Sequence, residues 1–215
     1  MRKEWYENTE WNNEISNVFE SKLSRAKISK KPQYLIAQAD ALKGKWNNIS
    51  KELVSRVLKD FPHDKLSYAI AMNLMGEILL EESKLLEAEE YFRYVHYDLK
   101  TNFRENMKNG FDGSDVKLIK IILISKQKEK YNEAYKLAKE HDIDLDFFKY
   151  NKYEFTYYAA WLCKEMGKID EAKRYAKMAL EFAIDKRLDA PRHGDLGAFE
   201  APEEELKFLS DIVYK

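Results

Sequence analysis

Cysteine, glycine and proline are scarce in this chain of 215 residues. Cys163 is the only cysteine, which excludes a disulfide within the chain and any zinc site built from cysteines. With only 7 glycines and 4 prolines, long stretches contain no residue that interrupts a helix. Charged residues make up 35% of the chain, and Lys, Glu, Leu and Ala are frequent. This composition predicts an all-α protein.

Long apolar runs and an excess of one charge are also missing. The most apolar segment, residues 118–124, is short and interrupted by Lys120, so we expect no transmembrane helix. The first residues, Met1 to Trp5, lack the apolar core of a signal peptide, which favours a cytoplasmic protein. The formal net charge is -1, with 37 basic and 38 acidic residues. This balance does not favour nucleic acid or an anionic membrane as a partner.

Two helix-length apolar patterns meet at residues 166–168 and predict a helical hairpin. Small residues stand where two antiparallel helices approach most closely, at Ala160, Ala172 and Ala179. Cys163 falls on the inner side of the first helix, where we expect a buried and unreactive thiol. Such a hairpin cannot bury its apolar face alone, so it requires neighbours of the same kind.

An earlier segment repeats this pattern. Gly76 and Ala88 are twelve residues apart, as are Ala160 and Ala172, and Phe92 follows Ala88 by four residues. The pattern resembles the tetratricopeptide repeat, a helix-turn-helix unit. The small residues that open the second helices are separated by 38, 46 and 38 residues, which exceeds the usual repeat of about 34. These small residues are Ser50, Ala88, Ala134 and Ala172.

The resemblance implies an all-α, right-handed stack of antiparallel helical hairpins, a tetratricopeptide-like solenoid with capping helices at both ends. We expect a single domain over residues 1–215. Its N-terminal arm and helix cover residues 1–31, and its C-terminal capping helix covers residues 202–214. The four hairpins are expected at residues 32–62, 66–100, 114–141 and 146–187.

In this family the first helix of each hairpin lines a concave face that holds a peptide. Carried over to this chain, the face implied by the resemblance consists of Asn73, Glu77, Ile119, Lys126, Tyr157, Trp161 and Lys164. For Tyr157 and Trp161, packing between repeats or against the C-terminal helix is an equal alternative. The leading hypothesis is a scaffold for an unidentified protein or peptide, as in bacterial regulators with such arrays. The arm with Trp5 and Trp11 covers either the first hairpin or a second subunit, so a homodimer stays open.

The competing hypothesis is a helical RNA-binding protein or ribonuclease. Arg187 and His193 loosely resemble the Arg-spacer-His motif of the HEPN ribonucleases, although Pro191 interrupts the helix that the motif requires. Residues 22–31 contain the densest basic cluster, whose simpler interpretation is a solvated helix end. No other arrangement of residues suggests an enzyme.

Metal and cofactor sites are not indicated by any motif. Asp142, Asp144 and Asp146 alternate as in a calcium loop, but Phe147 and Tyr153 replace the glycine and the glutamate that such a loop requires. Glycine-rich phosphate loops and dinucleotide fingerprints are also missing from the sequence. We therefore expect no metal and no cofactor.

Overall fold

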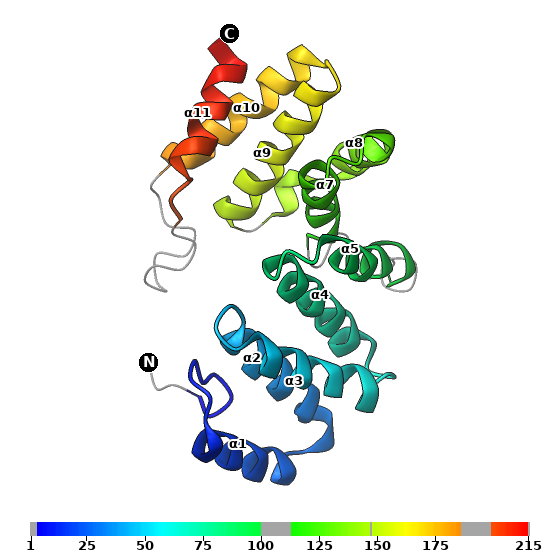
Figure 1. The fold of residues 1–215 in the computed structure, drawn as a ribbon, viewed down its shortest axis with the longest axis vertical. Coiled ribbons are helices and arrows are strands. Elements are labelled where there is room, and N and C mark those ends of the chain that lie inside the picture. The colour runs from blue at the N-terminus through cyan, green and yellow to red at the C-terminus, as the bar shows by residue number, and fades with distance from the viewer. Residues whose placement is uncertain (1–3, 100–112, 147, 186–198, 215) are drawn as a thin grey trace. The chain divides into compact units, whose positions relative to one another are not determined.

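The computed structural model describes residues 4–99, 113–146, 148–185 and 199–214, and its regular elements within these ranges are all helices (Figure 1). The prediction of an all-α protein is confirmed. The chain divides into two compact units, Met1–Phe103 and Arg104–Lys215. A single domain over the whole chain stays a prediction. None of the helices in the described ranges has the length and hydrophobicity needed to cross a bilayer.

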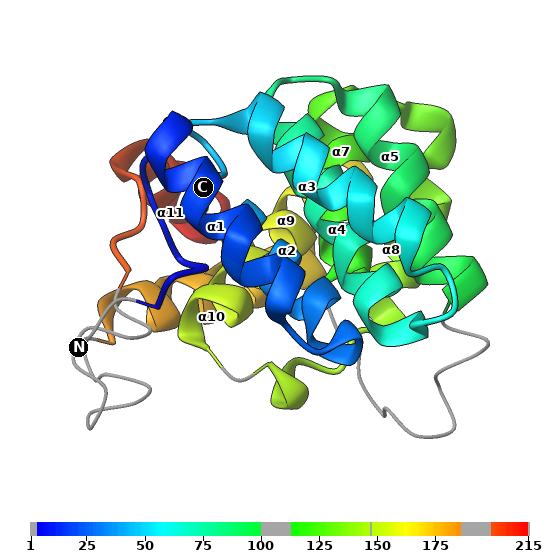
Figure 2. The same cartoon turned by 90° about the horizontal axis from the view of Figure 1, so that it is seen from below.

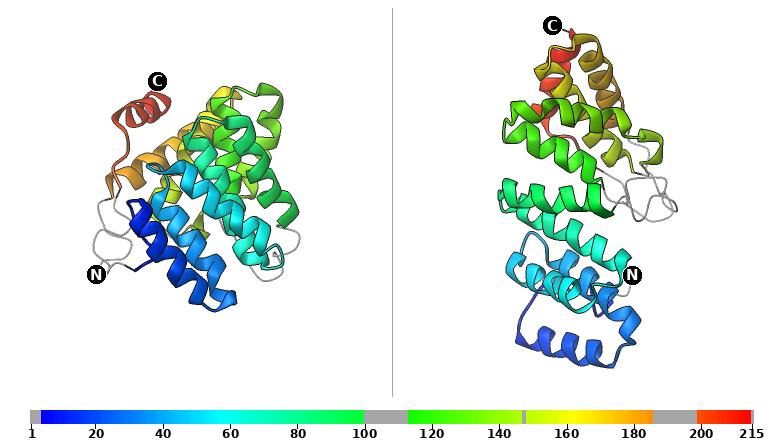
Figure 3. Two further views of the ribbon diagram at one scale, coloured as in Figure 1. Left: turned by 60° about the horizontal axis from the view of Figure 1, so that its bottom comes forward. Right: turned by 90° about the vertical axis from the view of Figure 1, so that its right-hand side faces the viewer.

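The first unit contains two helical hairpins preceded by one helix. Its helices are α1 (Asn13–Arg25), α2 (Lys31–Leu42), α3 (Asn47–Asp60), α4 (Lys65–Glu81) and α5 (Leu85–Arg93), which continues as the π-helical segment η2 (Tyr94–Leu99). Helix α2 packs on α3, and α4 packs on α5 (Figures 2 and 3). Asn12 caps α1 by accepting a hydrogen bond from the backbone N–H of Ile15, and Pro32 lies in the first turn of α2.

The second unit contains two further hairpins and a final helix. Its helices are α7 (Ser114–Ile124), α8 (Tyr131–Glu140), α9 (Lys149–Glu165), α10 (Ile169–Ile184) and α11 (Glu203–Tyr214). Helix α7 packs on α8, α9 packs on α10, and α11 contacts both α10 and α9. Helix α9 begins at Lys149, three residues after the expected start of its hairpin at residue 146, and the 3-10 turn η4 (Ile143–Leu145), capped by Asp142, precedes it. Residues 100 and 187, the expected ends of the second and fourth hairpins, lie outside the described residues.

Small residues lie where the helices of a hairpin meet, as the sequence predicts. A Cβ atom placed on Gly76 would lie 2.9 Å from Cζ of Phe92, so the ring packs directly on the backbone of α4. In the second unit Ala160, Ala172 and Ala179 are at most 1% exposed. Close packing of this kind fixes the rotation of each helix about its axis.

The first helices α4, α7 and α9 end in the same way, whereas α2 is followed by the extended residue Lys43 before its glycine. A residue with positive φ stands two positions beyond the last helical residue: Gly44, Ser83, Lys126 and Gly167. After the last three, the next backbone N–H reaches the carbonyl five residues earlier, at 2.8 to 3.0 Å. This left-handed residue provides a common reference point for counting back along each first helix.

Gly76→Ala tests the helix contact in the first unit. A methyl group would press on the ring of Phe92, which is fully buried. We expect a loss of about 1 kcal/mol, because strain of about 2 kcal/mol outweighs the gain in helix propensity of about 1 kcal/mol. Urea unfolding measures this difference. Phe92→Leu added to Gly76→Ala should cost less than the sum of the single changes, and a stabilised Gly76→Ala would contradict the assignment.

Candidate functional site

We define the inner face of a hairpin by two residues of its first helix, ten and six positions before the left-handed turn residue. These two positions are one helical turn apart and therefore lie on the same side of the helix. They are occupied by Tyr34 and Gln38 in α2, Asn73 and Glu77 in α4, Val116 and Lys120 in α7, and Tyr157 and Trp161 in α9.

Two residues of the predicted peptide-binding set lie elsewhere. Ile119 is completely buried, and Lys126 is itself the left-handed residue of its turn. A side chain without exposed surface has no area to offer a peptide, so we drop Ile119. The cause is turn length: eight residues separate Lys126 from Ala134, whereas five residues separate the equivalent positions after α4 and α9. The extra residues form the 3-10 turn η3 (Lys128–Lys130).

The inner face of α9 is covered by α11. The ring of Phe208 lies 5.9 Å from the ring of Tyr157 and 6.1 Å from the ring of Trp161. Lys164 places its Nζ 4.4 Å from the centre of the Phe208 ring. Of the two interpretations for Tyr157 and Trp161, the structure therefore shows packing against the C-terminal helix. All three predicted residues of α9 contribute to one surface that holds an aromatic side chain.

A carboxylate of α11 complements this surface. The hydroxyl of Tyr153, one turn before Tyr157, donates a hydrogen bond of 2.8 Å to Glu205. Burial and this hydrogen bond raise the pKa of Tyr153. Burial and the charges of Glu205 and Glu204 raise the pKa of Tyr157 to about 12, so both hydroxyls stay protonated near neutral pH. The face thus offers a proton donor and a lysine beside its aromatic rings.

The inner face of α2 is covered by the N-terminal arm, residues 4–12. Tyr34 packs on two aromatic rings of the arm that also contact each other, 4.9 Å from Trp5 and 4.7 Å from Tyr6. Gln38 is completely buried and forms hydrogen bonds with Asn8. The arm therefore covers the first hairpin, one of its two predicted targets. Neither Tyr34 nor Gln38 was identified from the sequence, where Gln38 is only a polar residue in an apolar helix.

The inner face of α4 is polar. Nδ2 of Asn73 donates a hydrogen bond of 3.3 Å to Glu77, which also pairs with Lys43, the residue that follows α2. Oδ1 of Asn73 is buried and has no hydrogen-bond partner among the described residues. An unsatisfied buried acceptor costs free energy, so this amide is a natural place for an incoming donor.

The residues of the competing ribonuclease hypothesis are not assembled into a site by the described chain. Arg187 and His193 lie outside the described residues. In the basic cluster Lys22 lies 5.8 Å from the ring of Trp5, and Arg25 donates to Ser21 on its own helix. Cys163 is fully buried, as expected, and burial raises the pKa of its thiol to about 11.

A buried histidine joins three elements of the second unit. His141 lies 2.7 Å from Asp115 of α7 through Nδ1 and 3.0 Å from Asp146 through Nε2, and it stacks on Phe155 of α9. Burial lowers the pKa of His141, but the hydrogen bonds and charges of the two carboxylates outweigh burial and raise the pKa from 6.5 to about 9. Each of the two ring nitrogens of His141 is hydrogen-bonded to a different carboxylate. The arrangement therefore links these parts of the second unit and leaves no lone pair for a ligand.

Stability should therefore depend on pH through His141. Its folded pKa lies above the unfolded value, so its contribution is complete below pH 6.5 and is lost as the pH rises through about 9. Chemical unfolding at several pH values should show a decrease on the order of 2 kcal/mol over this window. His141→Gln, which keeps a polar amide without the charge, should flatten the profile. An equal pH dependence in both proteins would contradict this role.

Phe208→Ala tests whether α11 covers the inner face of α9. Removing the ring exposes Trp161 and eliminates the contact with Lys164, so we expect a loss of about 1 to 2 kcal/mol and a red shift of tryptophan emission. The exposed neighbour Lys207→Ala is the matched control and should change neither quantity. The red shift should vanish when Trp161 is replaced by Phe in both proteins. A persistent shift would assign the signal to another tryptophan.

No family model, curated protein or solved structure matches this chain. The function proposed for it therefore depends on the geometry of the inner faces.

Proposed function

We propose that this chain is a tetratricopeptide-like scaffold that binds segments of partner proteins on the inner faces of its hairpins. One observation carries the proposal: the face of α9 already holds a segment from a distant part of the sequence. Phe208 lies against Tyr157, Trp161 and Lys164, about four dozen residues away along the chain. A surface that selects an aromatic anchor in this way suits a protein segment as its ligand.

The tetratricopeptide-like architecture is part of the same proposal. It is supported by the small residues between paired helices and by the left-handed residue that ends each first helix. In this proposal the hairpins form a right-handed stack, with α1 and α11 as caps and the chain acting in the cytoplasm. Capping helices cover the apolar faces that end repeats would otherwise expose.

The chemistry of the α9 face indicates the kind of segment that it binds. Tyr157, Trp161 and the Lys164 side chain favour an aromatic or large apolar anchor. The Tyr153 hydroxyl can donate a hydrogen bond to a carboxylate, as it does to Glu205, and Lys164 adds positive charge nearby. We therefore propose partners that carry an acidic residue close to an aromatic residue.

Affinity capture from the source organism tests this function. Wild-type protein should recover a defined partner, and Trp161→Ala with Lys164→Ala should reduce its recovery by about tenfold or more, as expected for loss of an interface anchor worth at least 1.4 kcal/mol. The matched control is Lys173→Ala with Lys177→Ala on α10, which should recover the partner normally. Equal recovery by all three proteins would contradict binding on the α9 face.

RNA binding is the outcome that would favour the competing function. Incubation with labelled RNA should give no retention by the purified protein. Salt-sensitive retention, weakened when lysines of residues 22–31 are replaced, would contradict a purely protein-binding role, because contacts with phosphates weaken steeply as salt increases.

A further inference from the structure

The N-terminal arm lies on the inner face of α2 as a bound peptide does. Residues 4–12 form no regular helix and reach α2 by contacts that span about thirty residues of sequence. Trp5 and Tyr6 pack on Tyr34, and Glu10 pairs with Lys45 in the turn after α2. Trp11 ends the segment against Phe19 of α1, with ring centres 5.7 Å apart. The contacts therefore follow the arm from one end to the other.

Gln38 recognises the backbone of the arm. Its Nε2 donates to the carbonyl of Asn8 at 2.8 Å, and its Oε1 accepts from the backbone N–H of Asn8 at 3.2 Å. The side-chain amide thus pairs with one residue as a neighbouring β-strand would. Its Oε1 also accepts from Nδ2 of Asn8 at 2.9 Å, so Gln38 holds both the backbone and the side chain of this residue.

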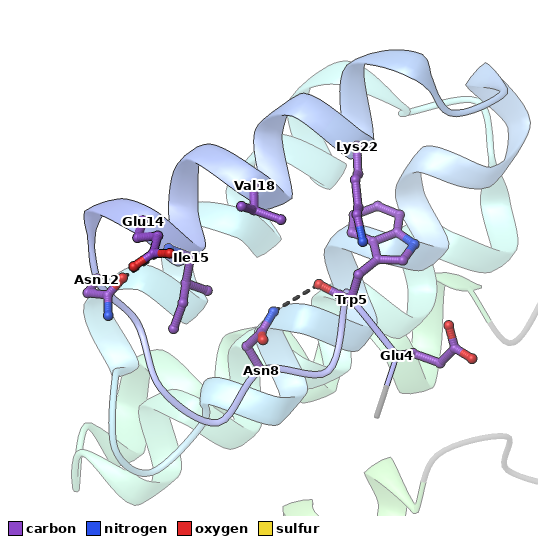
Figure 4. Close-up of a pocket in the computed structure, with 8 residues that line it drawn as sticks. All are labelled: Glu4, Trp5, Asn8, Asn12, Glu14, Ile15, Val18 and Lys22. Atoms are coloured by element: carbon purple, nitrogen blue, oxygen red, sulfur yellow. Dashed lines mark hydrogen bonds between the residues drawn. The ribbon is translucent and has the colours of Figure 1, made fainter. Parts of the chain in front are cut away.

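The packing of Trp5 and Tyr6 on Tyr34 makes the inner face of α2 selective for aromatic side chains. On the side that faces α1, the arm is not fully packed. A hollow of about 800 Å³ lies between the arm and α1, lined by arm residues and by the α1 side chains of Ile15, Val18 and Lys22 (Figure 4). Val18 remains 48% exposed beside it. The arm also contacts α1, because the rings of Trp5 and Trp11 lie 5.5 and 5.7 Å from the ring of Phe19, so the hollow marks the part of this contact that is not closely packed.

We propose that the inner face of α2 binds a non-helical segment of a partner protein, and that the N-terminal arm is its internal competitor. The partner segment carries two adjacent aromatic residues, and the backbone of the residue two positions after the second aromatic pairs with Gln38. This inference rests on the proposed scaffold function and names the ligand of a second inner face.

A partner must compete with the internal arm for the inner face of α2, which lowers its apparent affinity. A tethered segment acts at an effective concentration of about 1 mM, far above that of a free peptide. The apparent affinity of a partner is therefore reduced by the fraction of molecules in which the arm is released. Weakening the arm should strengthen binding of an added peptide, which a face used only for folding would not show.

Fluorescence anisotropy with a labelled peptide of residues 4–12 tests this inference on the full chain. Wild-type protein should bind the peptide weakly, and Trp5→Ala with Tyr6→Ala in the protein should bind it about tenfold more tightly or better, because the competitor is weakened. Asn8→Pro in the protein should act in the same direction, since proline lacks the N–H that Gln38 accepts. Far-UV circular dichroism checks that each variant keeps its helices, and Asn8→Pro retains the rings of Trp5 and Tyr6 in the protein.

Two controls locate the binding. Gln38→Leu added to Trp5→Ala with Tyr6→Ala should abolish the gain, and a peptide with both aromatic residues replaced by alanine should not bind. Equal affinity in the wild type and both arm variants, or a gain that survives Gln38→Leu, would overturn the inference. Wild-type dimers that dissociate when the arm is changed, seen by light scattering, would make a second copy the occupant and would also overturn it.

The scaffold function fails by a different result. If capture depends on Trp161 while no variant binds the arm peptide, only the α2 inference is lost. If capture is independent of Trp161, binding on the α9 face is lost, whatever the peptide experiment shows.

Discussion

The close approach of the two helices in each hairpin is the constraint on which the rest of the structure depends. The backbone of α4 at Gly76 touches the ring of Phe92, and alanines take the equivalent places between α9 and α10. Once one side of a first helix is pressed against its partner, its rotation is fixed, and a different side faces away. The packing within each hairpin therefore determines which residues lie on its inner face.

Local features of the sequence predict most of this architecture. Helical periodicity, small residues at fixed spacing and few breakers are enough to place the hairpins. Turn length is different, because apolar periodicity carries no information about how many residues join two helices. The three residues of η3 therefore shifted the predicted face of α7, which put Ile119 on the surface when it is completely buried. Counting from Lys126, the turn residue, places Val116 and Lys120 at the positions equivalent to Tyr157 and Trp161, although Val116 is itself only 5% exposed.

What covers the faces was harder to predict, because those contacts join distant parts of the chain. Tyr157 and Trp161 were identified on α9, but Phe208 does not belong to the apolar stripe that predicts α11. Gln38 gave no signal, since a single amide in a helix is usually solvated. Its role depends on Asn8, thirty residues earlier, and long-range pairs of this kind are not visible in one sequence.

The two covered faces differ in how readily they exchange their occupants. Helix α11 buries Leu209 completely and leaves Ile212 only 7% exposed, and burial of each such side chain stabilises by about 1.5 to 3 kcal/mol. The arm instead relies on partly buried aromatic rings and on hydrogen bonds to Gln38, each worth about 1 kcal/mol net. It also leaves a hollow against α1. A partner therefore displaces the arm from α2 at a lower cost than it displaces α11 from α9.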